Sequence, residues 1–556
     1  MQGLMQDRPL LISSLLDHAE RYHPEVEIVS RTCEGTVVCS SWARLAGRVR
    51  RMAQALRRLG VKPGDRIATL AWNTHRHLEL YFAVSGMGAV LHTVNPRLFP
   101  EQIEYILNHA ESTVLFFDIT FADLVCDLRP KLSSARTLIA MTDAAHQPAS
   151  LDGARCYEAL VDAEDGAFVW PELDEKAASS LCYTSGTTGH PKGVLYSHRS
   201  TVLHSFLACQ ADGLQLSSRD STLLVVPLFH VNAWGIPYAS AMCGAKLVLP
   251  GPAPDSRCLF DLAVAERCTF SLGVPTIWLS WFKYLDDNPS LDRSGLKLER
   301  VVIGGSAAPR AVIERFQELG VFVIHAWGMS ETSPLATIGN LLPKHASLPA
   351  AAQVDIQVKQ GRAVYGVELR IVDDRGAPLP QDGSVSGDLQ VRGPWVTAGY
   401  FRAEGVAALD PDGWFSTGDV ARIDADGYVQ ITDRSKDVIK SGGEWISSID
   451  LENAALEHPS VQEAAVIGVH HPKWQERPLL LIVPKPSAQA SCEEIRKFLG
   501  TRVARWWLPD DVVFVDSLPH TATGKLQKTK LREQFRGYEL PAAVHGERRA
   551  ERAGAG

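Results

Sequence analysis

The sequence predicts an α/β protein with a large N-terminal domain of helix-covered mixed sheets, a β-rich subdomain within it, and a small α+β C-terminal domain. Three observations support this fold class. The chain has 556 residues, too many for one hydrophobic core. Helical and strand patterns alternate from residue 40 to about residue 330. Short strands between Asp/Gly turns then follow, and a new unit begins after about residue 436.

The first part of the chain repeats a helix followed by a strand. Apolar side chains at helical spacing predict a helix over 42–60, and an apolar run predicts a buried strand over 65–72. The pattern recurs with a helix over 100–110 and a strand over 112–118. Such alternation is typical of parallel or mixed sheets covered by helices. Later strands are predicted over 221–227, 298–305 and 321–327.

The second part is divided by its change of pattern. Asp/Gly turns between roughly 360 and 432 predict the β-rich subdomain. After it, about 100 residues suffice for an independent α+β domain. Its helices are predicted over 447–458 and 492–507, and its strands over 463–470, 477–485 and 511–518. The predicted organisation is an N-terminal domain over 1–432, a junction over 433–437, a C-terminal domain over 438–540, and a disordered Ala/Gly/Arg-rich tail over 541–556.

Composition excludes several classes of function. Lys and Arg number 56 against 64 Asp and Glu, and the net charge of −8 argues against nucleic acid as the main partner. The 10 cysteines form no CxxC pair and no His/Cys cluster, which indicates reduced thiols and a cytoplasmic protein. No stretch approaches the ~18 apolar residues of a transmembrane segment. Contact with a membrane surface stays open.

The strongest chemical signal is LCYTSGTTGHPKGV, residues 181–194. Glycines let a backbone approach a phosphate closely, and successive amides form an anion nest. Hydroxyl groups and Lys192 add hydrogen-bond donors and charge. A flexible surface turn is the alternative, but such turns seldom lie between a strand and a PKG segment. The candidate loop consists of Thr184, Ser185, Gly186, Thr187, Thr188 and Gly189.

YTSGTTGHPKGV resembles the signature of the adenylate-forming superfamily, which contains acyl-CoA synthetases, peptide-synthetase adenylation domains and beetle luciferases. The resemblance extends over roughly residues 10–536. It is strongest to bacterial medium- and long-chain fatty acyl-CoA ligases, through FHVNAWG and DVIKSGGEWISSIDLEN. Four further segments occur in the family's order: WGMSET (327–332), GWFSTGD (413–419), DRSKDVIKSGGEWIS (433–447) and PHTATGKLQK (519–528).

The resemblance implies a ligase that works in two steps. A carboxylic acid attacks ATP to give an acyl-adenylate and pyrophosphate, and coenzyme A then takes the acyl group and releases AMP. The resemblance also implies Mg²⁺ and a C-terminal domain that swings about the junction, with Lys436 at the hinge position. Family members are often dimers, so a homodimer stays open.

Three residues are the catalytic candidates that the resemblance implies. Lys192 holds the β- and γ-phosphates with the glycine-rich loop, and Glu331 holds Mg²⁺ with help from a Thr184 oxygen. Lys525 reaches over the α-phosphate and the attacking carboxylate. For Glu331 the alternative is a favourable place at a helix N-terminus. For Lys525 it is ordinary solvated surface charge.

The resemblance also implies where the nucleotide and CoA bind. Trp327 offers a flat face to adenine, with core packing as the alternative. Asp419 accepts the ribose hydroxyls, with a simple turn role as the alternative. The other nucleotide candidates are Gly305, Ser306, Ala307, Gly328, Met329, Ser330 and Arg434. The CoA channel, or else a simple β-turn, comprises Lys440, Ser441, Gly442, Gly443, Glu444 and Trp445.

FHVNAWG bears on the acid that is activated. Amino-acid-activating relatives usually carry Asp at the position of His230, so an α-amino acid is disfavoured. His230 either orients the substrate or packs. Trp234 resembles the aromatic gate of fatty acyl-CoA ligases, with core packing as the alternative. The candidates for the acyl pocket are His230, Val231, Ala233, Trp234, Gly235, Ala307 and Ala308.

The leading prediction is a ligase for a medium- or long-chain fatty acid. A short substituted acid such as 3-methylmercaptopropionate and an aryl acid remain alternatives. A carrier-protein-loading ligase and a luciferase-like oxidation are less favoured. A non-catalytic nucleotide sensor is disfavoured because the reactive candidates occur together: Lys192, Glu331, Asp419, Arg434 and Lys525.

Overall fold

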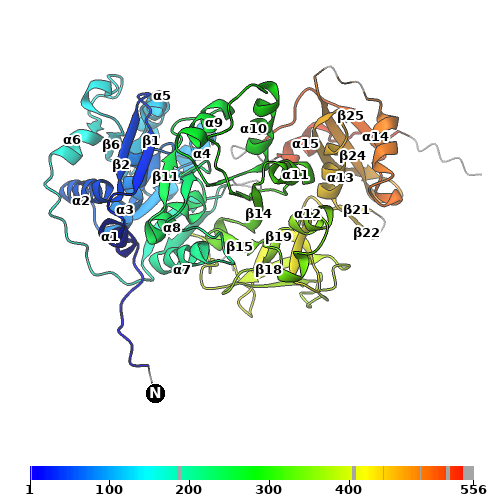
Figure 1. The fold of residues 1–556 in the computed structure, drawn as a ribbon, viewed down its shortest axis with the longest axis horizontal. Helices are drawn as coiled ribbons and strands as arrows, with labels where there is room; N and C mark the ends of the chain where they lie inside the picture. The colour runs from blue at the N-terminus through cyan, green and yellow to red at the C-terminus, as the bar shows by residue number, and fades with distance from the viewer. Residues whose placement is uncertain are drawn as a thin grey trace, which may run out of the picture. The chain divides into compact units, whose positions relative to one another are not determined.

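The fold is known from a computed structural model of the chain. It describes residues 1, 3–184, 190–403, 408–441, 444–486, 488, 490–520 and 526–541. These residues form two compact units (Figure 1). The first contains 1–417 and 421–431, and the second contains 418–420, 432–520 and 526–541. A large mixed α/β body and a smaller unit confirm the predicted fold class.

A seven-stranded sheet lies in the first unit, in the order β7-β6-β5-β3-β4-β8-β9. All neighbouring strands are parallel except β8 and β9. Alternate residues enter different hydrophobic clusters, as Phe116 and Phe117 do, so both faces are buried. The strands are β3 (Arg66–Leu70), β4 (Val90–Thr93), β5 (Val114–Phe117), β6 (Thr137–Ala140), β7 (Arg155–Cys156), β8 (Ala178–Tyr183) and β9 (Gly193–Ser197).

A second, 13-stranded path runs β2-β1-β11-β10-β12-β13-β14 and continues through β15-β16-β20-β19-β18-β17. The predicted β-rich region therefore continues an α/β sheet. The first seven strands are β1 (Glu27–Arg31), β2 (Val37–Ser41), β10 (Ser221–Leu223), β11 (Lys246–Leu249), β12 (Phe270–Gly273), β13 (Arg300–Ile303) and β14 (Phe322–Gly328). The others are β15 (Leu335–Ile338), β16 (Gly361–Ala363), β17 (Glu368–Val372), β18 (Gly387–Arg392), β19 (Phe415–Ile423) and β20 (Tyr428–Arg434).

Twelve α-helices are described in the first unit. All residues of α3 (His75–Gly86) are buried, and its charged side chains are paired. Thus Arg76 contacts Glu158 at 2.7 Å, and Glu79 pairs with Arg48. The other helices are α1 (Ile12–Tyr22), α2 (Trp42–Arg58), α4 (Pro100–His109), α5 (Ala122–Leu128), α6 (Tyr157–Asp162), α7 (His198–Cys209), α8 (Ile236–Cys243), α9 (Ser256–Ala265), α10 (Pro275–Asp287), α11 (Arg310–Glu318) and α12 (Ala350–Gln357). Among the described residues, none of the helices combines the length and the apolar character needed to cross a bilayer.

The second unit is built on a five-stranded sheet in which β24 pairs with β23, β21 and β25. Its central strands are apolar on both faces, because Leu480 and Leu481 enter different clusters. Ser447 begins α13 by accepting a hydrogen bond from the Asp450 amide at 3.0 Å. The elements are β21 (Ile439–Ser441), β22 (Glu444–Ile446), α13 (Ser448–Leu456), β23 (Val461–His471), β24 (Gln475–Pro484), α14 (Cys492–Leu499), β25 (Asp511–Phe514) and α15 (Lys528–Gln534).

Several predicted elements are shorter than expected. The strands predicted over 298–305 and 511–518 are observed only as β13 and β25. The strand predicted over 221–227 ends at Leu223, and the Asn73 amide binds the Leu224 and Val226 carbonyls that a longer ladder would have used. The helix predicted over 492–507 ends at Leu499, and a separate 3₁₀ turn covers 505–507. At the end of α14 the Thr501 hydroxyl donates to the Phe498 carbonyl at 2.9 Å, so at the ends of both β10 and α14 a side chain takes over backbone groups of the regular ladder.

Asp118, which follows β5, should make stability depend on pH. It is buried, it accepts a hydrogen bond from the Trp72 amide at 2.7 Å, and burial raises its pKa to about 7. Between about pH 4 and 7 the folded state then holds more protons than the unfolded chain, so stability falls as pH rises through this window. The parent should therefore lose stability relative to Asp118→Asn as the pH rises. From pH 5 to pH 8, we expect the difference in the free energy of unfolding to change by roughly 2–3 kcal/mol in favour of the variant. Urea unfolding at both pH values tests this. The exposed Asp123→Asn on α5 should show no such trend.

Candidate active site

The neck of the glycine-rich loop is closed by hydrogen bonds between its two ends. Tyr183 on β8 pairs with Gly193 on β9. The Thr184 amide donates to the Lys192 carbonyl at 2.9 Å, and the Lys192 amide donates to the Thr184 hydroxyl at 3.2 Å. The predicted phosphate residues 185–189 lie outside the described residues. Thr184, the first residue of the predicted loop, directly follows β8, and Lys192 directly precedes β9.

Helix α4 supports both ends of this neck. The His109 Nδ1 atom lies 2.7 Å from the Tyr183 hydroxyl oxygen. The Tyr105 ring stacks on His190, with ring centroids 4.3 Å apart. Burial lowers the pKa of His109, and the nearby Arg402 adds to this effect. A neutral imidazole can accept the tyrosine proton, so the contact suits neutral pH.

Glu331 and Lys192, predicted from separate segments, both contact Tyr400. Glu331 lies on the short 3₁₀ turn Ser330–Thr332 after β14 and is 6% exposed. The Tyr400 hydroxyl donates to Glu331 Oε1 at 2.8 Å. The Lys192 ammonium lies 4.8 Å from the centroid of the Tyr400 ring. A carboxylate and a lysine of the predicted phosphate site therefore converge on one aromatic side chain.

The oxygen donors fit a metal that arrives with its nucleotide. Mg²⁺ prefers oxygen ligands and is usually held by one or two carboxylates together with substrate phosphates. Glu331 offers such a carboxylate. Within the part of the chain that the structure describes, no group of three or more His, Cys, Asp or Glu side chains forms a metal cage. The Glu331 carboxylate is the kind of ligand that Mg²⁺ bound with a triphosphate would take from the protein.

The predicted nucleotide segments lie at the carboxyl ends of two neighbouring strands. Strand β13 pairs in parallel with β14 at Ile303 and His325. The turn with Gly305, Ser306 and Ala307 follows β13, and Trp327 and Gly328 end β14. Parallel sheets commonly bind ligands at this edge. Met329 and Ser330 continue directly from β14, and the Ser330 carbonyl accepts a hydrogen bond from the Tyr196 hydroxyl at 2.7 Å.

Glycine is required in this region for close packing of the chain. A Cβ atom on Gly328 would lie 1.8 Å from the Pro334 carbonyl oxygen. Gly305 has a φ of +79°, which is favourable only for glycine. Both glycines are thus explained by the backbone, whatever ligand the turn holds.

The predicted acyl-pocket residues form one left-handed turn. Val231, Asn232, Ala233 and Trp234 have φ between +45° and +54°, each costing roughly 1–2 kcal/mol in a residue with a Cβ. The Asn232 side-chain amide donates to the Ser180 hydroxyl at 2.8 Å. It also accepts a hydrogen bond from the Cys182 thiol at 3.2 Å. These bonds to β8 hold the strained turn.

Trp234 lies against the predicted nucleotide turn. A methyl group built on Gly304 would meet its ring at 3.1 Å. The next residue, Gly235, is also closely packed, because a Cβ atom there would lie 2.5 Å from the His204 ring. His230 begins the turn, and its carbonyl accepts a hydrogen bond from the Ala233 amide at 3.0 Å. The acyl and nucleotide candidates of the first unit are therefore neighbours.

The second unit contains the predicted ribose and hinge residues. Arg434 lies 3.0 Å from Asp419, which is 3% exposed. Desolvation lowers the pKa of Lys436, while Asp437 opposes this effect. An ion pair between Asp419 and Arg434 orients the carboxylate that is predicted to meet the ribose.

The predicted CoA segment forms a hairpin. In β21 and β22, Lys440 pairs with Trp445 and Ser441 pairs with Glu444. The Lys440 amide donates to Glu476 at 3.0 Å, and Ser441 is buried. Gly442, Gly443 and Lys525 lie outside the described residues, so their predicted roles stay predictions.

Two neighbours of the site are not predictable from the motifs of the sequence. Tyr400 lies outside every segment used for the prediction, and Asn232 lies within FHVNAWG without a role assigned to it. An isolated tyrosine in WVTAGYF has no spacing that indicates chemistry. Asn is among the few residues that tolerate a left-handed conformation, which is the one available signal for Asn232.

The fold is that of the adenylate-forming enzymes, and the comparisons with known proteins agree. The profile of the AMP-binding enzyme family matches residues 16–401, and that of the AMP-binding enzyme C-terminal domain matches residues 450–525. The chain belongs to the AMP-binding enzyme family, among its AMP-forming acyl-CoA ligases, which use ATP and CoA. The predicted superfamily is thereby confirmed.

Its relatives include ligases for different acids. A 3-methylmercaptopropionyl-CoA ligase of Ruegeria lacuscaerulensis is 53% identical over 544 residues, 96% of this chain and 99% of that one. A medium-chain-fatty-acid–CoA ligase of Ectopseudomonas oleovorans is 49% identical over 537 residues, 96% of this chain and 98% of that one. The crystal structure of the anthranilate CoA ligase AuaEII with anthranoyl-AMP is 25% identical, with a TM-score of 0.84. Its match covers 96% of this chain and 99% of that one.

Proposed function

We propose that this acyl-CoA ligase activates a short substituted carboxylic acid of the 3-methylmercaptopropionate type. The proposal rests on the placement of Trp234 against Gly304, because a bulky ring there would limit the length of an acid bound beside the nucleotide turn. The relatives at 53% identity that are named 3-methylmercaptopropionyl-CoA ligases support it. The earlier leading prediction, a medium- or long-chain fatty acid, becomes the second candidate.

The proposed chemistry places positive charge and hydrogen-bond donors around the triphosphate. Adenylation joins an acid oxygen to the α-phosphorus and breaks the bond to pyrophosphate, so negative charge develops on phosphate oxygens. Lys192 and the Thr184 hydroxyl face this charge at the neck of the loop, and Lys525 is assigned to the α-phosphate. When bound with ATP, Mg²⁺ supplies further positive charge beside Glu331.

The second proposed step moves the acyl group from AMP to sulfur. The CoA thiol loses its proton and attacks the acyl carbon, and the bond to AMP breaks. Asp419, oriented by Arg434, is assigned to the ribose hydroxyls and keeps the adenylate in place. The β21–β22 hairpin is assigned to pantetheine. Hinge motion at Lys436 would bring Lys525 to the site for the first step and the β21–β22 hairpin for the second.

A panel of acids tests the substrate class. Straight-chain acids from two to eighteen carbons, 3-methylmercaptopropionate and aryl acids are compared by kcat/KM for AMP release, with and without CoA. We expect CoA-dependent release and a maximum for short acids, including 3-methylmercaptopropionate. A maximum at medium chain length would favour the fatty-acid candidate. ATP binding without turnover of any acid would favour the nucleotide sensor.

Shortening the Trp234 side chain should shift this preference. We expect Trp234→Leu to favour longer acids, because each methylene that becomes buried adds about 0.8 kcal/mol, roughly a fourfold gain in kcat/KM. The measurement is the ratio of kcat/KM for an eight-carbon acid to that for a four-carbon acid. Trp474→Leu, at an exposed tryptophan of the second unit, is the control and should leave the ratio unchanged. An unchanged ratio in Trp234→Leu would contradict the proposed role of Trp234 in limiting acid length.

A further inference from the structure

Residues 394–401 form a strap that links the two halves of the phosphate site. The Trp395 indole donates to the Leu335 carbonyl at 2.9 Å, and the Thr397 amide donates to the Glu331 carbonyl at 2.7 Å. At the other end, the Phe401 amide donates to the Gly193 carbonyl at 2.8 Å. The strap therefore joins the backbone around Glu331 to the strand that begins just after Lys192.

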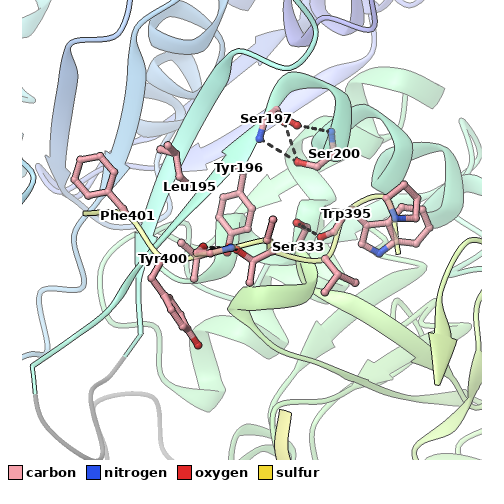
Figure 2. A pocket seen from close by; sticks show the side chains of 14 residues that line it. Leu195, Tyr196, Ser197, Ser200, Ser333, Trp395, Tyr400 and Phe401 are labelled. Carbon is pink, nitrogen blue, oxygen red and sulfur yellow. Dashed lines mark hydrogen bonds between the residues drawn. The ribbon is translucent and has the colours of Figure 1, made fainter. Parts of the chain in front are cut away.

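Tyr400 makes the same link with its side chain. Its hydroxyl binds the Glu331 carboxylate at 2.8 Å, and its ring lies under the Lys192 ammonium at 4.8 Å. Together with Tyr196 and Ser333, Tyr400 lines a pocket of about 320 Å³ that the strap borders. These lining residues are labelled in Figure 2. The Tyr400 hydroxyl thus donates to the Glu331 carboxylate, and the face of its ring contacts the Lys192 ammonium. Both contacts are electrostatically favourable.

We propose that Tyr400 is a positioning residue that fixes the spacing between Glu331 and Lys192. This inference rests on the proposed adenylation at this site. The hydrogen bond from Tyr400 to one carboxylate oxygen of Glu331 restricts the rotation of that side chain and leaves the second oxygen available to a metal. A lysine side chain has many rotamers, and the aromatic face restricts them. Both groups are then preorganised for a metal-bound triphosphate.

Simple core packing is the competing explanation, and two substitutions separate it from positioning. Tyr400→Phe keeps the ring over Lys192 and removes only the bond to Glu331. Tyr400→Leu removes both contacts. Tyr428→Phe is the matched control, because the buried Tyr428 hydroxyl donates at 2.7 Å to the Asn340 carbonyl and lies 3.5 Å from His345 Nδ1. Among the described residues, it contacts none of the predicted site residues.

Binding of Mn²⁺, followed by its electron paramagnetic resonance signal in the presence of a non-hydrolysable ATP analogue, is the direct readout. We expect Tyr400→Phe to weaken Mn²⁺ binding by about 10- to 100-fold, the loss typical of a hydrogen bond to a charged group. Affinity for the analogue without a divalent ion should change less than threefold. Tyr400→Leu should weaken binding of both, since Lys192 also loses its support. Tyr428→Phe should leave both unchanged.

The rate of adenylation gives a second, independent test. Tyr400→Phe should raise the Mg²⁺ concentration for half-maximal pyrophosphate release, while kcat at saturating Mg²⁺ falls by less than tenfold. Parental Mn²⁺ affinity in a folded Tyr400→Phe protein would overturn the inference, and so would equal losses for metal and analogue. If the parental protein itself releases no pyrophosphate with any acid, the proposed function fails, but the Mn²⁺ comparison still decides the role of Tyr400.

Discussion

Replacing Lys525 by alanine is expected to slow acyl-adenylate formation by about 10²–10³-fold, the loss typical when one preorganised charged donor is removed from a transition state. The resemblance assigns Lys525 to the α-phosphate and the attacking carboxylate. In the second step these groups have already reacted. Thioester formation from supplied acyl-adenylate should therefore remain within a fewfold of the parental rate.

Two half-reactions measured separately test this assignment. Pyrophosphate release reports adenylation, and acyl-CoA formation from chemically prepared acyl-adenylate reports the second step. Lys497→Ala on the exposed face of α14 is the control and should leave both rates intact. Equal losses of the two half-reactions in Lys525→Ala would mean that the lysine acts on the whole fold or on a shared step.

Replacing Lys528 by methionine is expected to destabilise the second unit by about 3–5 kcal/mol, the usual result of removing one partner of a buried ion pair. The Lys528 ammonium lies 2.7 Å from Glu452 and also donates to the Ser448 hydroxyl. Burial tends to lower the pKa of Lys528, but the carboxylates of Glu452 and Asp433 outweigh burial and raise it. The lysine therefore stays charged, and methionine would leave Glu452 buried without its counter-charge.

A double-mutant cycle separates the pair from general packing. Lys528→Met combined with Glu452→Gln should recover part of the loss, because the neutral amide needs no cation and still accepts from the Val466 amide. Hydrogen exchange of β23 and β24 in the full chain measures the effect locally. Arg502→Met breaks an exposed pair with Glu457 at 2.9 Å and should cost less than about 1 kcal/mol. If Lys528→Met and Arg502→Met cost equal amounts of stability, the buried-pair explanation would be contradicted.

Local pattern predicted much of the architecture because many elements carry their own signals. The helix predicted over 42–60 is observed as α2 (Trp42–Arg58), and the strand predicted over 112–118 is observed as β5. Both have an apolar spacing that burial requires. The early end of β10 was not predictable, because the side chain that takes over its carbonyls is Asn73, far away in the sequence.

The candidate site was predicted where chemistry requires a recognisable string of residues. Thr184, Lys192 and Glu331 belong to such strings, and the structure brings Lys192 and Glu331 to one tyrosine. Tyr400 itself gave no signal, because its role depends on the strap crossing from β15 to β9. The left-handed conformation of Val231 and Trp234 could not be predicted either, since neither residue favours positive φ.

The left-handed turn has a consequence for attempts to change which acids the enzyme accepts. Its shape depends on Asn232 and on two partners in a different part of the chain, Ser180 and Cys182. Transplanting FHVNAWG alone into another ligase would therefore transfer the residues of the turn without their hydrogen-bond partners on β8. A chimera that exchanges this segment together with β8 would keep both hydrogen bonds to Asn232, and with them the conformation of the predicted acyl-pocket residues.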